Sequence, residues 1–246
     1  FDIDGSPAPL GTANIFETYE QQSTEFRVVS PQGGRVDWIF GLYSDSGDLK
    51  DAGIVGAVAN ILPIPGARVS PNVLAQQSMD SSAVFGEIGI QMTETLKAKV
   101  GFRHDEVEKS IDHKASIFII LPNPALMGIP APGPLALPGA AINPGFAPWA
   151  MKESRKDTAS QPSLTLEWTP DDNRMYYFSW KEGFKSGGYD LDAFFYPTVK
   201  KTLGFNPEEV EALELGARMD MESARVNVTA FSSDYKDLQV AVFNGV

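Results

Sequence analysis

The chain has 246 residues, of which 43% are hydrophobic and 21% charged, and its formal net charge is −12 at pH 7. This apolar content excludes a disordered chain, and an acidic balance without a basic cluster argues against a nucleic-acid partner. The chain has no cysteine and only two histidines, His104 and His113, which argues against a disulfide framework and a histidine-rich metal site. We therefore predict no metal and no cofactor.

The sequence has no apolar run of roughly 18 residues or more, so we expect no transmembrane helix. Its start, FDIDGSPAPLG, has no basic n-region, no apolar h-region and no initiator methionine. We expect the chain to begin as a mature or excised piece would.

The dominant sequence period is two, which is typical of strands with one apolar and one polar face. In LKAKVGFRHDE the apolar residues Leu96, Ala98, Val100 and Phe102 alternate with polar or small ones. In this way the sequence predicts eight strands, at 22–30, 35–44, 79–92, 96–110, 160–169, 174–184, 210–221 and 224–242.

Tight turns and long loops alternate between these strands. The turns lie at Gly33-Gly34, Glu94, Asp171-Asp172 and Ser223, and each joins two alternating runs as a hairpin. The loops span roughly 45–77, 113–158 and 185–206. The middle loop is rich in Pro, Gly and Ala, and we interpret it as an ordered or semi-ordered loop and not as a linker. This alternation is the pattern of an outer-membrane barrel, with short periplasmic turns and long extracellular loops.

The stretch NPEEVEALELG competes with this all-β interpretation. Asn206 could be an N-cap, Pro207 the first helical residue, Glu209 the capping-box acid and Gly216 the stop signal. Since the residues after Glu211 alternate with period two, we predict a short turn of helix or a bend near Pro207 and then a strand.

Candidate catalytic residues are better explained by structural roles. His104 falls on the opposite face from Arg103 and Asp105, and the chain has no Gly-x-Ser-x-Gly motif, so we predict that the protein is not an enzyme. Adjacent or alternate carboxylates could serve a glycosidase, but turn and strand-end positions favour solvated acids. These carboxylates are Glu106 with Glu108, Asp171 with Asp172, and Glu208 with Glu209.

Basic and aromatic residues each allow two interpretations. Lys97, Lys99 and Arg103 could line an anion path or contact an acidic plug, but we favour cross-strand charge pairing. The aromatics could form a ligand-stacking platform, but we favour lipid-facing residues and interfacial girdles. Trp168 fits a periplasmic girdle, and Trp180 and Phe184 an outer one; the remaining aromatics of this set are Trp38, Tyr176 and Phe178.

Four hairpin sequences carry a family likeness. FNPEEVEALELGARMD followed by ARVNVTAFSSDYKDLQV, within 205–240, resembles the barrel of TonB-dependent outer-membrane receptors, as does the preceding MYYFSWKEGFKSGGYD. SSAVFGEIGIQMTETLKAKVGFRHDEVEK, at 81–109, and EFRVVSPQGGRVDWIFGLYSD are similar to earlier hairpins of that family. The matches occur in the expected order over nearly all of the chain outside the long loops.

The resemblance implies an all-β, antiparallel transmembrane barrel of 22 strands, filled by a plug with a TonB box. This sequence shows about eight strands, no plug segment, and an end, VFNGV, without the terminal aromatic residue of a complete barrel. We therefore expect residues 1–246 to be part of such a barrel, with the plug absent from this chain. The chain would be an internal part of a receptor or a truncated gene product.

The resemblance also implies a function and partners. We expect part of an outer-membrane receptor of a Gram-negative bacterium that takes up a scarce solute, such as a ferric siderophore, with energy from TonB through the missing plug. Outer-membrane lipid would be a further partner. The alternatives are a passive porin-like channel and a soluble β-sheet protein. Solute-binding residues would lie in the three long loops, with Lys185, Ser186, Tyr189 and Asp190 as candidates. Gly183, Gly187 and Gly188 would let the backbone bend out of the strand ladder there.

Overall fold

A computed structural model describes residues 11–31, 33–59, 67–121, 135–139, 147–191, 193 and 202–240. The described chain forms strands and no helix, as its period-two pattern predicts. The strands are β1 (Gly11–Val29), β2 (Val36–Ala59), β3 (Arg68–Gln91), β4 (Leu96–Leu121), β5 (Leu135–Pro138), β6 (Trp149–Asp171), β7 (Arg174–Lys185), β8 (Gly188–Tyr189), β9 (Gly204–Phe205), β10 (Glu208–Asp220) and β11 (Arg225–Lys236).

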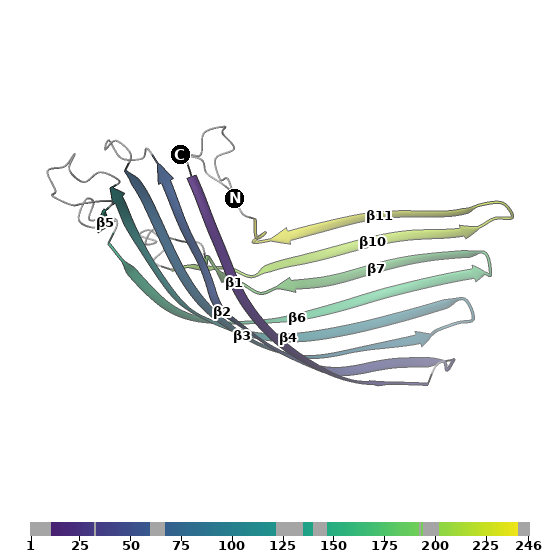
Figure 1. The fold of residues 1–246 in the computed structure, drawn as a ribbon. Helices are drawn as coiled ribbons and strands as arrows, with labels where there is room; N and C mark the ends of the chain where they lie inside the picture. Colours follow the sequence, from purple (N-terminus) through teal and green to yellow (C-terminus); the bar gives the residue numbers. More distant parts are fainter. Residues whose placement is uncertain are drawn as a thin grey trace.

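The main sheet is antiparallel and follows the order β1-β2-β3-β4-β6-β7-β10-β11, with β5 pairing to the far end of β4. Figure 1 shows it as one continuous curved sheet, with the tight turns gathered at one end of the strands. The turns are the four that the sequence predicts, and Gly33 adopts a φ of 87° in the first of them. Glycine tolerates this left-handed conformation because it has no Cβ.

Strands β2, β3, β4 and β6 are far longer than the sequence predicts. The predicted loops at 45–77 and 113–158 are wrong for most of their described length, because β2 continues to Ala59, β3 begins at Arg68, β4 continues to Leu121 and β6 begins at Trp149. A tilted membrane crossing needs about 9–11 residues, whereas β4 has 26. These four strands therefore extend well beyond one bilayer thickness.

The helical turn that was one alternative near Pro207 does not form, whereas the strand predicted after it does. Asn206 and Pro207 lie outside any helix, and β10 begins at Glu208 in register with Lys185 of β7. Two neighbouring strands, β7 and β11, supply hydrogen-bond partners to β10, so sheet pairing outweighs the local capping-box signal.

The residues nearest the turns, here called the turn half, divide cleanly between the two faces. On the long strands β2, β3, β4 and β6 most outward positions of the turn half are apolar, and they are exposed or half-buried. Val100 and Phe102 of β4 are 59% and 49% exposed, and the paired rows continue this apolar face from β1 to β11. The outward band ends at Leu42, Val84, Phe102, Pro162, Trp180, Leu213 and Ala230, and the next outward residues are Ser44, Ser82, His104, Ser160, Glu182, Glu211 and Ser232.

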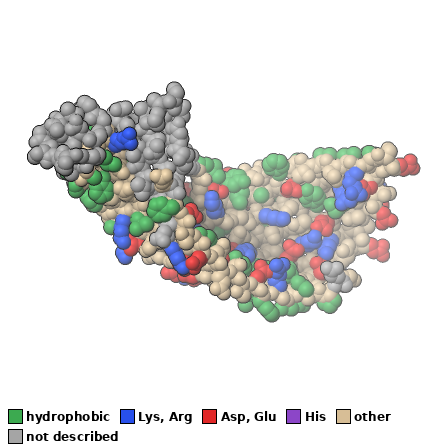
Figure 2. Space-filling model, in the orientation of Figure 1, with side chains coloured by type: hydrophobic (Ala, Val, Ile, Leu, Met, Phe, Trp, Pro, Cys, Tyr) green, Lys and Arg blue, Asp and Glu red, His purple; other side chains and the backbone are tan. Residues whose placement is uncertain are grey.

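The inward, concave face of the turn half is charged, and Figure 2 shows acidic and basic side chains along its trough. Lys97 Nζ lies 2.6 Å from Asp37 Oδ1, and Lys99 Nζ lies 2.5 Å from Glu167 Oε1. Arg103 forms a fork on Asp105, with Nη2 at 2.7 Å from Oδ1. The basic residues are thus paired with carboxylates, as we favoured over an anion path, and they face away from Leu96, Ala98, Val100 and Phe102 as the alternation predicts.

Beyond the band, in what we call the far half, the two faces exchange character. On β4 the inward residues from Val107 onward include Ile111, Ala115 and Ile117, all of which are at most 9% exposed. The outward positions from Glu106 to Ser116 are polar, such as Glu108 and Ser110. Pairing of β4 with β3 and β6 shows no register shift at this point, so the side-chain pattern itself inverts. Among the described residues, no helix is long and apolar enough to cross a membrane.

Candidate functional site

The chain that follows β7 returns over the inward face of the far half. Residues 186–191 and 202–205, here called the docked segment, contain the two short strands β8 and β9, in which Gly188 is opposite Phe205 and Tyr189 opposite Gly204. The Asp190 N–H donates to the Leu203 carbonyl at 2.9 Å, which extends this pairing by one bond. The docked segment thus forms a small second layer above β4 and β6.

A row of charged side chains on β4 and β6 holds the docked segment, largely through its backbone. Lys109 Nζ donates to Ser186 Oγ and to the Gly187 carbonyl, each at 2.8 Å. Arg155 forms a fork on Asp157 and donates its third nitrogen, Nη1, to the Phe205 carbonyl. Asp157 in turn accepts from the Gly187 N–H at 3.0 Å.

Glu153 completes this row at the other end. Its Oε2 accepts from the Thr202 hydroxyl at 2.6 Å, and its Oε1 accepts from the Leu203 N–H at 3.4 Å. Backbone groups of a segment that leaves the sheet must find new partners when they are buried. The four side chains Lys109, Glu153, Arg155 and Asp157 provide these partners.

Gly187 and Gly188 allow this contact because they lack a side chain. A Cβ on Gly187 would overlap the Arg155 guanidinium and the Phe205 carbonyl oxygen, and one on Gly188 would lie 2.6 Å from Cζ of the Phe205 ring. Neither glycine has a positive φ. The predicted reason for this pair, a bend of the backbone, is therefore replaced by close approach to β6 and β9.

An apolar cluster anchors the docked segment above the charged row. Tyr189 and Leu203 are 6% and 4% exposed and pack with Ile111 of β4, while Trp149, Met151 and Leu191 lie around them. His113 is fully buried beside this cluster, with its ring stacked on Trp149 at 4.8 Å and its Nε2 at 3.3 Å from the Leu191 carbonyl.

Burial shifts the pKa of two groups in the site. It lowers the pKa of the Lys109 amine, and the neighbouring cations Arg155 and Lys185 act in the same direction, while Asp157 opposes them. Burial also raises the pKa of the Tyr189 phenol above 10.0, and the carboxylates Glu153 and Asp157 reinforce this shift. The Tyr189 hydroxyl is buried and has no hydrogen-bond partner among the described residues.

The four predicted site residues lie in or beside the docked segment, but they differ in environment. Ser186 accepts a hydrogen bond from Lys109, and Tyr189 packs in the apolar cluster, so both hold the docked segment in place. Lys185 is exposed at the end of β7, opposite Glu208, and Asp190 is exposed. Lys185 and Asp190 both line an open pocket of about 1050 Å³ between the docked segment and residues 237–240. Its other lining residues are Thr202, Gly204, Phe205, Asn206, Asp237, Leu238, Gln239 and Val240.

One residue of each candidate carboxylate pair has a structural partner. Glu106 pairs with Lys156 at 2.6 Å, Asp171 pairs with Arg174, and Glu208 accepts from the Gln239 N–H at 2.7 Å. His104 contacts Ser160 on the outward face, away from Arg103 and Asp105. Among the described residues, no group of three or more His, Cys, Asp or Glu could hold a metal ion.

The charged row is not predicted from the sequence, because residues 113–158 are expected there to form a loop. A signal for it exists in KESRKDT, where Glu153, Arg155 and Asp157 alternate with Lys152, Ser154 and Lys156. Applied there, the period-two rule would have placed the first three on one face of a strand.

Comparison with known proteins gives the family of this fold. Residues 3–246 match the family described as TonB dependent receptor-like, beta-barrel. The chain belongs to this family. The predicted barrel identity and the predicted all-β, antiparallel fold are thereby confirmed.

A solved structure of a TonB-dependent receptor shows a similar fold. The ferric yersiniabactin uptake receptor FyuA from Yersinia pestis matches with a TM-score of 0.71 at 16% sequence identity, over 95% of this chain and 31% of that one. The ferric-catecholate import receptor Fiu from K12 E. coli matches with a TM-score of 0.45 at 9% identity, over 93% of this chain and 39% of that one. The chain thus spans about a third of the length of the first of these receptors.

Proposed function

We propose that this chain is part of a 22-stranded outer-membrane barrel of a Gram-negative bacterium, through which a ferric siderophore is taken up with energy supplied by TonB. The observation that carries the proposal is the outward band of the turn half. A mostly apolar outward face, with charged residues on the opposite face, matches a wall between lipid and a wet lumen.

The docked segment supports a receptor over an open channel. It lies on the inward face, where a solute entering from the end opposite the tight turns would pass. Its charged partners Lys109 and Arg155 lie beneath it. We infer that solute binding involves the docked segment and the adjoining pocket, with Lys185 and Asp190 as contacts. TonB would act through a plug in the longer protein.

Uptake measurements test the proposal. A Gram-negative host that produces the intact receptor is supplied with radioactive iron bound to a panel of catecholate, phenolate and hydroxamate chelators, with and without functional TonB. We expect saturable uptake of at least one ferric chelate that disappears without TonB. Unsaturable entry that persists without TonB would instead establish the porin-like alternative.

The location in a membrane has its own test, which does not depend on the solute. The intact protein is transferred from detergent into plain buffer, and its state is followed by size-exclusion chromatography and circular dichroism. We expect aggregation, since the outward band would then face water. A folded monomer in plain buffer would favour the soluble alternative and refute the membrane location.

A further inference from the structure

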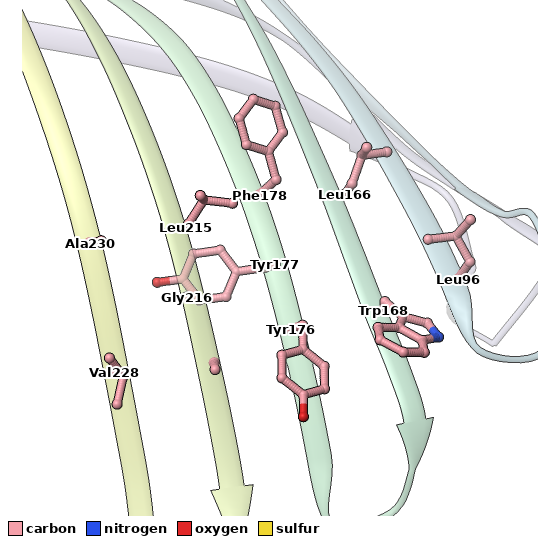
Figure 3. A pocket seen from close by; sticks show the side chains of 11 residues that line it. Leu96, Leu166, Trp168, Tyr176, Tyr177, Phe178, Leu215, Gly216, Val228 and Ala230 are labelled. Atoms are coloured by element: carbon pink, nitrogen blue, oxygen red, sulfur yellow. The ribbon is translucent and has the colours of Figure 1, made fainter.

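A shallow apolar groove of about 470 Å³ lies on the outward face of the turn half, across β6, β7, β10 and β11 (Figure 3). The row nearest the turns aligns Trp168, Tyr176, Ala217 and Val228 across these four strands. The next row aligns Leu166, Phe178, Leu215 and Ala230. Large side chains on β6 and β7 therefore stand beside two alanines, Ala217 of β10 and Ala230 of β11.

The floor of the groove is low because the outward side chains of Ala217 and Ala230 are small. Gly216 carries no side chain, and on the inward face the ring of Tyr177 occupies the space where its Cβ would be. The Tyr177 hydroxyl contacts Glu214, which fixes the ring there. The groove is thus part of the packed wall and does not depend on a mobile side chain.

An aromatic pair and an ion pair lie at the turn end of the groove. The Trp168 and Tyr176 rings stack with centroids 5.4 Å apart, as interfacial aromatics do at a membrane boundary. Arg174 precedes Tyr176 by two residues and therefore lies on the same outward face. Its Nε donates to Asp171 Oδ2 at 2.7 Å, and its Nη2 contacts the same oxygen.

The ion pair leaves both signs of charge available to a ligand. A guanidinium has five N–H donors, and Asp171 engages only two of its nitrogens. The Arg174 side chain is 54% exposed and that of Asp171 is 36% exposed. Asp172 is exposed in the same turn. This end of the groove therefore offers a cation and carboxylates within one short turn.

We propose that the groove binds one acyl chain of a phospholipid from the periplasmic leaflet, whose headgroup is zwitterionic and carries an amine. The phosphate would contact Arg174, and the ammonium would contact Asp171 and Asp172. A headgroup with both charges matches this turn better than a purely anionic one, since the carboxylates repel a second negative charge. The inference rests on the membrane location proposed above.

Native mass spectrometry of the intact protein in nanodiscs tests the proposal. The discs contain equal amounts of phosphatidylethanolamine and phosphatidylglycerol, and the lipids that remain bound after release are counted. We expect phosphatidylethanolamine to be enriched over the bulk ratio by about two- to fivefold, as an exposed pair of charges would produce. Arg174→Gln and Asp172→Asn should each reduce this enrichment.

A matched pair of substitutions isolates the groove from the rest of the apolar band. Ala217→Phe fills the groove and should abolish the enrichment. Val84→Phe places the same ring on the outward band of β3, outside the groove, and should leave the enrichment intact. Bound lipids at the bulk ratio, equal loss in both variants, or retention of lipopolysaccharide in place of phospholipid would each overturn the proposal.

Quenching of tryptophan fluorescence by brominated phospholipids distinguishes two kinds of failure. If brominated lipid quenches none of the outward tryptophans Trp38, Trp168 and Trp180, the outward band does not face lipid, and the membrane location fails together with the groove. If Trp168 is quenched but Ala217→Phe retains the wild-type enrichment, the membrane location stands and only the lipid site is refuted.

Discussion

The turn half and the far half of the same strands have opposite faces. Near the turns Val100 and Phe102 are exposed outward while Lys99 and Arg103 face inward. Further along β4 the inward residues Ile111 and His113 are buried and the outward ones are polar. Since strand pairing continues through this change without a register shift, the backbone does not distinguish the two halves.

The inversion indicates that the surroundings of the strands change. An apolar outward face is stable against lipid, whereas a polar outward face with a buried inward face is the arrangement of a sheet in water. The apolar inward face of the far half is covered in part by the docked segment, through Tyr189 and Leu203. We infer that the boundary between lipid and water lies just beyond the end of the outward band.

The largest expected effect comes from placing a charge on each side of this boundary. Val100→Arg should destabilise the protein by about 2–4 kcal/mol, because a cation would face the hydrocarbon. Ser110→Arg, at an outward position of the far half of the same strand, should change the stability by less than about 0.5 kcal/mol. Urea unfolding in lipid vesicles measures both variants. Equal losses in the two would place the boundary elsewhere.

The turn half was predictable from sequence, and the reason is physical. Each of its faces meets a uniform environment, so alternation in stretches such as LKAKVGF identifies the strand and its faces, and tight turns identify the hairpins. The far half was not predictable in the same way. Between Phe102 and Val107 the apolar residues of β4 move from the outward to the inward positions. A period-two rule that follows the apolar residues from the turn half therefore indicates the end of a strand there, although the strand continues.

Only the position of the docked segment in the chain could be predicted from the sequence, and not its contacts. The sequence indicated that the region after Lys185 leaves the strand ladder and could bind, but its contacts depend on residues 30 to 78 positions away, such as Asp157 and Lys109 with Gly187. Local propensity carries no information on such a contact. The glycine pair was singled out from the sequence, but its close approach to Arg155 of β6 and to Phe205 of β9 could not be predicted there.

A second comparison sharpens the role of that pair. Gly187→Ala should release the docked segment, with a cost of about 1–3 kcal/mol, because its Cβ would overlap both a side chain and a backbone oxygen. Gly183→Ala is the control, since its Cβ would meet only Cγ1 of Val210, which can rotate. The chain has no cysteine, so spin labels on introduced cysteines at Thr158 and Asn206 can report the distance between β6 and the docked segment. An unchanged distance distribution in Gly187→Ala would contradict this explanation.

A smaller effect separates the two faces of the far half. Asp157→Asn removes the charge that pairs with Arg155 and that accepts from the Gly187 N–H, and it should weaken docking by about 1–2 kcal/mol. Asp112→Asn removes a half-buried outward carboxylate that pairs with Lys152, and it should leave docking unchanged. The same spin-label distances measure both variants. If Asp112→Asn released the docked segment as well, the charged row would not be its specific anchor.

The smallest expected effect concerns the Tyr189 hydroxyl. Since burial raises the pKa of this phenol above 10.0, the docked state keeps a proton that the released segment loses at higher pH. Docking should therefore weaken as the pH rises above about 10, and more strongly in the wild type than in Tyr189→Phe. Lys109 is common to both proteins, and its lowered pKa favours docking as the pH rises toward 10.5, so the difference between the two curves isolates Tyr189.

Near neutral pH, Tyr189→Phe should dock as well as the wild type or slightly better, because it removes a buried hydroxyl without a partner among the described residues. The spin-label distances, recorded from pH 7 to about pH 11, measure both parts of this prediction. Coinciding curves would show that Tyr189 ionises only after release. A clear loss of docking in Tyr189→Phe at pH 7 would show that the hydroxyl has a partner in the docked state. The apolar cluster of the far half would then depend on a buried hydrogen bond, whereas the inward face of the turn half depends on paired charges.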